Sequence, residues 1–306
     1  MVVARLELVP IFLAPVLKLL KKNRNIEGIF MSNICFIGGG NMATSLIGGL
    51  IAKGHSADSI YVSDPNESQR SQLEQQFSVN TFADCKSAME NSDIVVLAVK
   101  PQIMKSVALD VKAAMSEIAK QPLFVSIAAG INLFSLQSWL GEDQAIVRCM
   151  PNTPSLIQLG ASGLFANEKT SIVQKNLAET VLKAAGIVQW VQSEEEIDAV
   201  TAVSGSGPAY YFLLMEAMID AGVELGLSRE TASELTIQTA IGAAQMAQKS
   251  DVDVAELRRR VTSPGGTTEQ AINTFEQANL RGIVKSALSA AHNRSGELAQ
   301  ELGEKS

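Results

Sequence analysis

The chain has 306 residues, of which 46% are hydrophobic and 19% charged, and it contains 22 glycines and 9 prolines. This composition is typical of a globular protein with an ample core, and the length favours two domains over one. The formal net charge of -7 argues against partners held through phosphate contacts, so no nucleic acid is expected to bind.

The N-terminal segment, residues 1–30, contains an apolar run that Pro10 and Pro15 interrupt and that most of its basic residues follow. The run is too short to cross a bilayer and lacks the cleavage site of a secretory signal. Residues 1–30 are therefore predicted to be an extension outside the fold, and no membrane association is expected. A peripheral membrane anchor is the alternative.

A regular alternation of strand and helix patterns begins at Met31. Residues 34–37 (ICFI) form a short apolar run, residues 38–43 (GGGNMA) break it, and helical spacing then continues to Gly54. Further apolar runs, predicted to be strands, lie at residues 60–62, 93–99, 123–128 and 145–150, with amphipathic stretches such as residues 102–119 between them. Strands that alternate with helices predict an α/β domain with a parallel sheet.

The strand signals stop after about residue 194. Residues 209–226 carry Glu216, Asp220 and Glu224 at helical spacing, as one narrow polar stripe on a helix that is otherwise apolar all round. Such a helix is expected to be buried on most sides. Residues 194–306 are therefore predicted to form an all-α domain that packs against its copy in a homodimer or a larger oligomer.

A glycine-rich turn follows the first predicted strand. Gly38, Gly40 and Ala43 satisfy the pattern G-x-G-x-x-A at the start of a helix. Missing side chains there let the backbone approach a pyrophosphate, and the helix N-terminus stabilises its charge. Residues 31–193 are therefore predicted to be a Rossmann-type dinucleotide-binding domain. A turn that needs small residues only for packing is the alternative.

The end of the second predicted strand bears on the choice of cofactor. Asp64 is placed to accept hydrogen bonds from ribose hydroxyls, as in NAD sites, whereas Ser63 and Arg70 suit a 2′-phosphate. These residues leave the choice between NADPH and NADH open.

Two later strand ends carry further candidates. Residues 99–101 (VKP) place Lys100 at the carboxyl edge of the sheet, where open parallel sheets bind ligands. Residues 149–154 (CMPNTP) put prolines on both sides of Asn152 and Thr153, in a stiff loop suited to fixing polar groups. An exposed lysine and an ordinary surface turn are the alternatives.

A second glycine-rich loop precedes a helix at residues 260–272 (RVTSPGGTTEQAI). Thr267 and Gln270 fit a capping box, and Gly265 and Gly266 would leave the helix N-terminus open to a carboxylate. Residues 204–210 (SGSGPAY) predict a similar bare helix start, with Pro208 at its first position. Two ordinary capped helices are the alternative.

The cysteines and histidines suggest no further chemistry. Cys35, Cys85 and Cys149 are odd in number, far apart and without a histidine at ligand spacing. Neither a disulfide framework nor a metal site is expected, and reduced thiols indicate a cytoplasmic protein. His55 and His292 lie in no motif and are expected to be structural or solvent-facing.

Taken in order, the motifs FIGGGNMA, LAVKP, SIAAG, RCMPNTP, DAVTAVSGSGPAYYF and VTSPGGTTEQAI resemble those of pyrroline-5-carboxylate reductases, from Met31 to about Leu302. The SPGGTT and SGSGPAY blocks are specific to that family. The resemblance implies a Rossmann domain followed by a helical dimerisation domain, in dimers that associate into a ring. It also implies reduction of the C=N bond of L-1-pyrroline-5-carboxylate to L-proline, the last step of proline biosynthesis, by NADPH or less often NADH.

The resemblance assigns roles to individual residues. Those expected to bind the cofactor are Gly38, Gly39, Gly40, Asn41 and Met42 at the pyrophosphate, Ser63, Asp64 and Pro65 at the ribose, Val99, Lys100 and Ala129 at the nicotinamide, and also Pro101 and Asn152. Those expected to bind the substrate are Glu194, Ser263, Gly265, Gly266, Thr267 and Thr268. The Thr268 hydroxyl would lie near the ring nitrogen and act as the catalytic group. Cys85 and Arg260 depart from the family pattern, which bears on cofactor affinity and preference.

Two other classes of function fit parts of the sequence. A β-hydroxyacid dehydrogenase shares the glycine turn and a helical second domain, but it needs a lysine base at a helix start where residues 204–212 (SGSGPAYYF) have none. A non-enzymatic cofactor-binding protein would have no use for the loop at residues 263–268.

Overall fold

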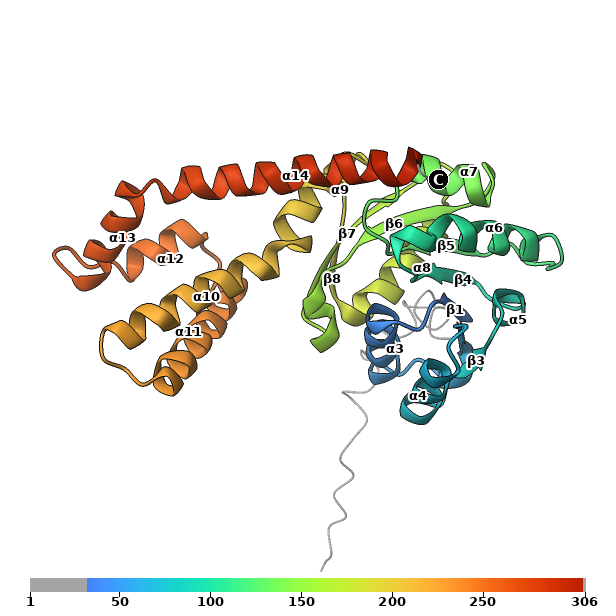
Figure 1. Ribbon diagram of the computed structural model, residues 1–306, viewed down its shortest axis with the longest axis horizontal. Helices are drawn as coiled ribbons and strands as arrows, with labels where there is room; N and C mark the ends of the chain where they lie inside the picture. The colour runs from blue at the N-terminus through green and yellow to red at the C-terminus, as the bar shows by residue number, and fades with distance from the viewer. Residues whose placement is uncertain (1–31, 305–306) are drawn as a thin grey trace, which may run out of the picture. The chain divides into compact units, whose positions relative to one another are not determined.

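The computed structural model describes residues 32–304 (Figure 1). The chain divides into two compact units, one of Met1–Glu194 with Ala299–Ser306 and the other of Glu195–Leu298. The predicted N-terminal extension, residues 1–30, lies outside the described residues.

In the described part of the first unit, an eight-stranded sheet has the order β3-β2-β1-β4-β5-β6-β7-β8. Its strands are β1 (Ile34–Ile37), β2 (Ile60–Ser63), β3 (Asn80–Phe82), β4 (Ile94–Leu97), β5 (Leu123–Ser126), β6 (Ile146–Met150), β7 (Gly160–Ala166) and β8 (Gly186–Trp190). The strands from β3 to β6 pair in parallel, in the order 3-2-1-4-5-6 of a Rossmann domain. The predicted domain type and all five predicted strands are confirmed.

One pairing contradicts the predicted parallel sheet, because β7 runs antiparallel to β6. Only the short helix η3 (Thr153–Ile157) and a few loop residues connect the two strands. A parallel pair needs a crossover of a dozen residues or more, so this short connection fixes the antiparallel direction.

Helices cover both faces of the sheet. They are α3 (Asn41–Ala52), α4 (Glu67–Phe77), α5 (Cys85–Met89), α6 (Met104–Met115), α7 (Leu133–Leu140) and α8 (Ile172–Leu182), with short η1 (Ala57–Ser59), η2 (Pro101–Ile103) and η4 (Lys183–Ala185). Residues of α3, α4 and α8 belong to the apolar cluster on one face, and residues of α5, α6 and α7 belong to the cluster on the other. Along β1, Ile34 and Phe36 face the first cluster while Cys35 and Ile37 face the second. Burial on both faces explains why the strands read as continuous apolar runs.

The described residues of the second unit form helices and loops. The elements are α9 (Glu196–Val200), a π-helical turn η5 (Thr201–Gly205), α10 (Gly207–Glu224), α11 (Arg229–Lys249), α12 (Val254–Arg260), α13 (Thr267–Gln277) and α14 (Leu280–Glu304), the last residues of which group with the first unit. The predicted helical domain is confirmed. No helix within residues 32–304 is long and apolar enough to cross a membrane.

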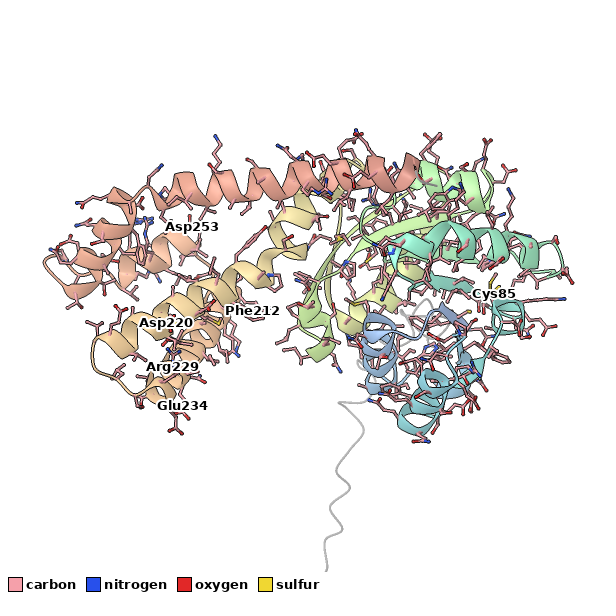
Figure 2. The ribbon with its side chains drawn as sticks, in the orientation of Figure 1. Cys85, Phe212, Asp220, Arg229, Glu234 and Asp253 are labelled. Atoms are coloured by element: carbon pink, nitrogen blue, oxygen red, sulfur yellow. The ribbon has the colours of Figure 1, made fainter. Side chains whose placement is uncertain are left out.

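Helices α10 and α11 form an antiparallel hairpin (Figure 1). A Cβ on Gly222 would lie only 3.1 Å from the Ala232 Cβ, so small residues allow the close packing of the two helices. The Ser228 side chain caps α11, and Arg229 Nη2 lies 2.8 Å from Asp220 Oδ1 across the turn (Figure 2).

Within a single chain α10 is largely exposed, so the burial expected for it is not supplied by its own chain. Phe212, labelled in Figure 2, is 64% exposed and Leu213 is 67% exposed, and of the whole helix only Gly207 is buried. Large exposed apolar side chains on neighbouring positions of one helix are typical of an interface with another protein surface.

The two histidines differ in their environment. His55 follows Gly54, which ends α3 with φ +92°, and its side chain is 5% exposed with no hydrogen-bond partner for Nε2 among the described residues. Burial lowers the pKa of His55, against an opposing contact with the Ser32 backbone. His292 is exposed.

We expect His55 to make the fold sensitive to acid. Because its folded-state pKa is lowered, the unfolded chain takes up the proton first as pH falls below about 6.5. The free energy of unfolding then falls as the pH decreases toward the folded-state pKa, by at most about 1.4 kcal/mol per pH unit. Urea unfolding from about pH 7.5 to about pH 5.5 should show a flatter decline for His55→Gln. His292→Gln is the control, and an equal flattening in both variants would contradict this role.

Candidate active site

The glycine turn lies where β1 ends beside β2 and β4. Gly38 N donates to Ser63 O at 2.8 Å, and Ala98 N donates to Ile37 O at 2.8 Å. Gly38 has φ +100°, and a Cβ there would lie 2.8 Å from Ala98 O. Only glycine combines this conformation with this close approach between neighbouring strand ends.

The helix that follows begins without a cap. Gly40 is the N-cap of α3, no side chain caps the first-turn amides, and a Cβ on Gly40 would meet nothing within 4 Å. Gly40 and Asn41 are exposed and Met42 is half-buried, whereas Ala43 is fully buried against the sheet. The free amides of this helix start are suited to a pyrophosphate.

The Asp64 carboxylate ties the loop after β2 to the glycine turn. Its Oδ2 accepts a hydrogen bond from Gly39 N at 2.9 Å, and its Oδ1 accepts one from Asn66 N at 2.9 Å. Arg70 Nη1 donates to Asp64 O at 2.7 Å and to Pro65 O at 3.1 Å. Both Asp64 oxygens therefore hold the loop after β2 in place, and the Arg70 guanidinium lies beside the same loop.

The remaining cofactor candidates of the first unit follow the neighbouring strand ends. Val99 and Pro101 are half-buried and Lys100 is exposed after β4, while Ala129 is exposed after β5. Asn152, after β6, is 9% exposed, and its Oδ1 accepts a hydrogen bond from Ala161 N at 2.9 Å. Because the carboxyl ends of these parallel strands meet at one edge, the fold gathers all predicted cofactor residues along that edge.

Glu194 lies beside a buried arginine that the sequence analysis did not single out. Its Oε1 lies 2.9 Å from Arg148 Nη1 and accepts a hydrogen bond from Leu133 N at 2.7 Å. The Arg148 side chain is 4% exposed and that of Glu194 25%. In the sequence, the feature that indicates a special role for Arg148 is its single charge within the apolar run of residues 145–150.

The loop of the second unit differs from the predicted capping box. Gly266, not Thr267, is the N-cap of α13, and Thr267 is the first helical residue. Glu269 Oε2 instead accepts a hydrogen bond from Gly265 N at 2.8 Å. The prediction was wrong because the N-cap is defined by its extended backbone, here φ -82° and ψ 170° at Gly266.

The start of α13 is nevertheless open. No side chain caps its first turn, so the amides there have no partner within the helix. Thr268 is half-buried and Ser263 and Thr267 are exposed, and Gly265 has φ +74°. The loop thus offers amides and hydroxyls that suit a small carboxylate.

The predicted bare helix start at residues 204–210 is wrong. The chain is already helical through α9 and η5, and Ser206 has the helical values φ -86° and ψ -17°. Ser206 N donates to Thr201 O at 2.8 Å, across the wide turn of a π-helix. Pro208 is the second residue of α10 rather than the first of a new helix.

The predicted site residues come from both units. The cofactor candidates and Glu194 belong to the first unit, and Ser263–Thr268 belong to the second.

The environments of the three cysteines disfavour the thiolate form. Burial raises the pKa of Cys35 well above its usual range and that of Cys149 to about 12. Cys85, the first residue of α5, is half-buried, and burial together with Asp110 raises its pKa (Figure 2). All three are free thiols. Among the described residues, no group of three histidine, cysteine or acidic side chains is placed to hold a metal ion.

Comparisons with known proteins match both units. Residues 194–298 match the family described as pyrroline-5-carboxylate reductase dimerisation, and residues 33–130 match the family described as NADP oxidoreductase, coenzyme F420-dependent. Pyrroline-5-carboxylate reductase of Pseudomonas aeruginosa is 55% identical over 271 residues, which cover 89% of this chain and 98% of that protein. The Arabidopsis thaliana protein of the same name is 38% identical over 267 residues, covering 87% of this chain and 95% of that protein.

Solved structures agree with these matches. A pyrroline-5-carboxylate reductase from Coxiella burnetii has a TM-score of 0.85 and 48% identity, covering 88% of this chain and 98% of that one. The Plasmodium falciparum pyrroline carboxylate reductase, solved with NADP bound, has a TM-score of 0.76 and 31% identity, with the same coverage of 88% and 98%.

The open glycine turn, the strand order and the helical second unit define an oxidoreductase with a Rossmann-type domain and a helical dimerisation domain. Identity of 55% across nearly the whole chain then specifies the family. The chain belongs to the pyrroline-5-carboxylate reductases.

Two glycines of the turn should respond differently to substitution by alanine. Gly38→Ala is expected to cost about 1–3 kcal/mol of unfolding free energy, because its φ is left-handed and its Cβ would meet Ala98 O. Gly40→Ala should fold normally but raise the Kd for NADPH about tenfold or more, because a methyl group would stand at the open helix start. Urea unfolding and cofactor fluorescence titration check both. Equal affinity of Gly40→Ala and the parent protein would argue against a pyrophosphate at this turn.

Proposed function

We propose that this chain reduces L-1-pyrroline-5-carboxylate to L-proline by hydride transfer from a nicotinamide cofactor, the last step of proline biosynthesis. The observation that carries the proposal is the 55% identity to the Pseudomonas aeruginosa enzyme over 98% of its length. The open helix starts of α3 and α13 support it, because one suits a pyrophosphate and the other a small carboxylate.

NADPH is the proposed cofactor, with NADH as the second. Arg70 lies over the backbone of Asp64 and Pro65, at the corner where the adenosine ribose is expected. A guanidinium there favours a 2′-phosphate. Each Asp64 oxygen accepts one bond, from Gly39 N or Asn66 N, and keeps a further lone pair for a ribose hydroxyl of either cofactor. The Plasmodium falciparum relative was solved with NADP bound.

The proposed chemistry needs positioning more than a strong acid. When bound, the reduced nicotinamide supplies a hydride, which goes to the carbon of the C=N bond while the nitrogen carries the proton. The imine is basic enough to bind largely as its cation or to take up a proton readily. Residues Ser263–Thr268 are proposed to hold the substrate carboxylate through the free amides of α13, with the Thr268 hydroxyl at the ring nitrogen. Glu194 is the predicted acidic group beside the substrate.

The proposed assembly is a homodimer that associates further into a ring. Its support is the exposed apolar side chains of α10, such as Tyr211, Phe212 and Leu213, within the region that matches the dimerisation family. A second copy of the chain would cover them. We propose a cytoplasmic enzyme because all three cysteines are free thiols, as is usual in a reducing compartment.

The loss of NADPH absorbance on addition of pyrroline-5-carboxylate tests the reaction, with proline measured as the product. Thr268→Ala is expected to lower kcat/KM about 10- to 100-fold, because it removes the hydroxyl at the ring nitrogen. Thr274→Ala is the control, since Thr274 lies on the same helix and its hydroxyl bonds to Gln270 O. An inactive parent protein that binds NADPH would overturn the proposal and lead to a screen of hydroxyacids.

Arg70→Gln should change the choice of cofactor. Removal of the guanidinium is expected to raise the KM for NADPH about tenfold and to leave the KM for NADH nearly unchanged, because only NADPH carries the 2′-phosphate. Lys105→Gln, which removes a charge from an exposed position of α6, is the control. Parallel changes for both cofactors would contradict a 2′-phosphate contact.

A further inference from the structure

Arg148 is a buried charge close to the sheet edge that carries the predicted cofactor site. Its neighbours Val147 and Cys149 belong to the first apolar cluster and Ile146 to the second. Alternation along β6 therefore directs the Arg148 side chain to the face covered by α6 and α7. Burial of an unpaired guanidinium there would be strongly destabilising, and Glu194, at 2.9 Å, supplies the opposite charge.

Glu194 has a second contact, with the start of α7. The oxygen that pairs with Arg148 also accepts a hydrogen bond from Leu133 N at 2.7 Å. Leu133 is the first residue of α7, and the Asn132 side chain accepts from Ser135 N in the same turn. The carboxylate thus lies at the positive end of a helix, opposite a guanidinium, and both interactions hold it in place.

Two hydrogen bonds hold the loop between β5 and α7, one at each end. At its beginning, Ile127 N donates to Leu97 O at 3.2 Å, on the neighbouring strand β4. At its end, Leu133 N donates to Glu194. Between them Ile131 is 1% exposed and Gly130 has φ +71°, whereas Ala129 is exposed. Ala129, one of the three residues expected at the nicotinamide, lies in the loop between these two contacts.

We propose that Arg148 and Glu194 are positioning residues for hydride transfer. Glu194 acts through the Leu133 amide to hold residues 128–132 against the nicotinamide, and Arg148 holds Glu194. This inference rests on the proposed function. It assigns Glu194 a role other than the predicted substrate contact. Loss of positioning would lower kcat, whereas loss of a substrate contact would raise the KM for pyrroline-5-carboxylate.

Two neutral double variants separate positioning from stability. Arg148→Met with Glu194→Gln removes both charges and keeps an acceptor for the Leu133 amide. Arg148→Met with Glu194→Met removes the charges and the acceptor. Neither variant leaves a buried charge unpaired, so both avoid the main cause of unfolding in the single variants. Asp143→Asn, which breaks the exposed pair with Lys169, is the control and should behave as the parent protein.

The Glu194→Met double variant is expected to lower kcat about 10- to 100-fold at saturating substrates, because a small misplacement of the nicotinamide slows hydride transfer. NADPH deuterated at the transferred position should then give a larger isotope effect, and the KM for pyrroline-5-carboxylate should change little. The Glu194→Gln double variant should recover part of kcat at a similar Tm.

Equal kcat in the two double variants at equal Tm would overturn the proposal, because the acceptor would then have no role. A raised KM for pyrroline-5-carboxylate with unchanged kcat would also overturn it, in favour of a substrate contact. If the parent protein binds NADPH without turnover, the proposed function fails, yet the Kd for NADPH still tests the positioning. That Kd should rise severalfold in the Glu194→Met double variant alone, and an unchanged Kd would overturn the positioning as well.

Discussion

The close approach at Gly38 is the constraint on which the first unit depends. Strands β1 and β4 end side by side, and the turn after β1 passes so near Ala98 that a Cβ would lie 2.8 Å from its carbonyl oxygen. With φ +100° at this residue, the chain leaves β1 and starts α3 within three residues. The helix therefore begins at the sheet edge with free amides, and the same glycine that allows the close packing leaves a helix start suited to an anion.

Charged side chains then fix the loops around that edge. Asp64 joins the loop after β2 to Gly39, and Glu194 joins the loop after β5 to Arg148 on β6. Each carboxylate accepts a hydrogen bond from a backbone amide as well as making its other contact. A charged group of this kind holds a loop more firmly than apolar packing, because its geometry is directional and leaving it unpaired is costly. Both loops are thus tied to this edge by side-chain hydrogen bonds of the chain itself.

The second unit is organised differently, because one chain does not bury its apolar surface. Helices α10 and α11 pack closely at Gly222 and Ala232, but Phe212 and Leu213 stay exposed. Such a surface is costly in water and agrees with the match of residues 194–298 to a dimerisation family. The proposed assembly would therefore also stabilise the helical unit, because it would remove these apolar side chains from water.

The sequence by itself determined the glycine turn, five strands and the helical second unit, because each is encoded by residues close together in the chain. Four other features were decided only by the tertiary structure: strand β7, the cap of α13, the helical path of residues 204–206 and the pair of Arg148 and Glu194. Strand β7, rich in small residues, gives no apolar run, and its antiparallel direction follows from a short connection. The cap of α13 depends on the backbone of Gly266 rather than on residue type, and residues 204–206 continue a helix that α9 had already begun. Arg148 and Glu194 are 46 residues apart, and no local pattern encodes a pair that forms only when the fold brings the segment after β8 beside β6.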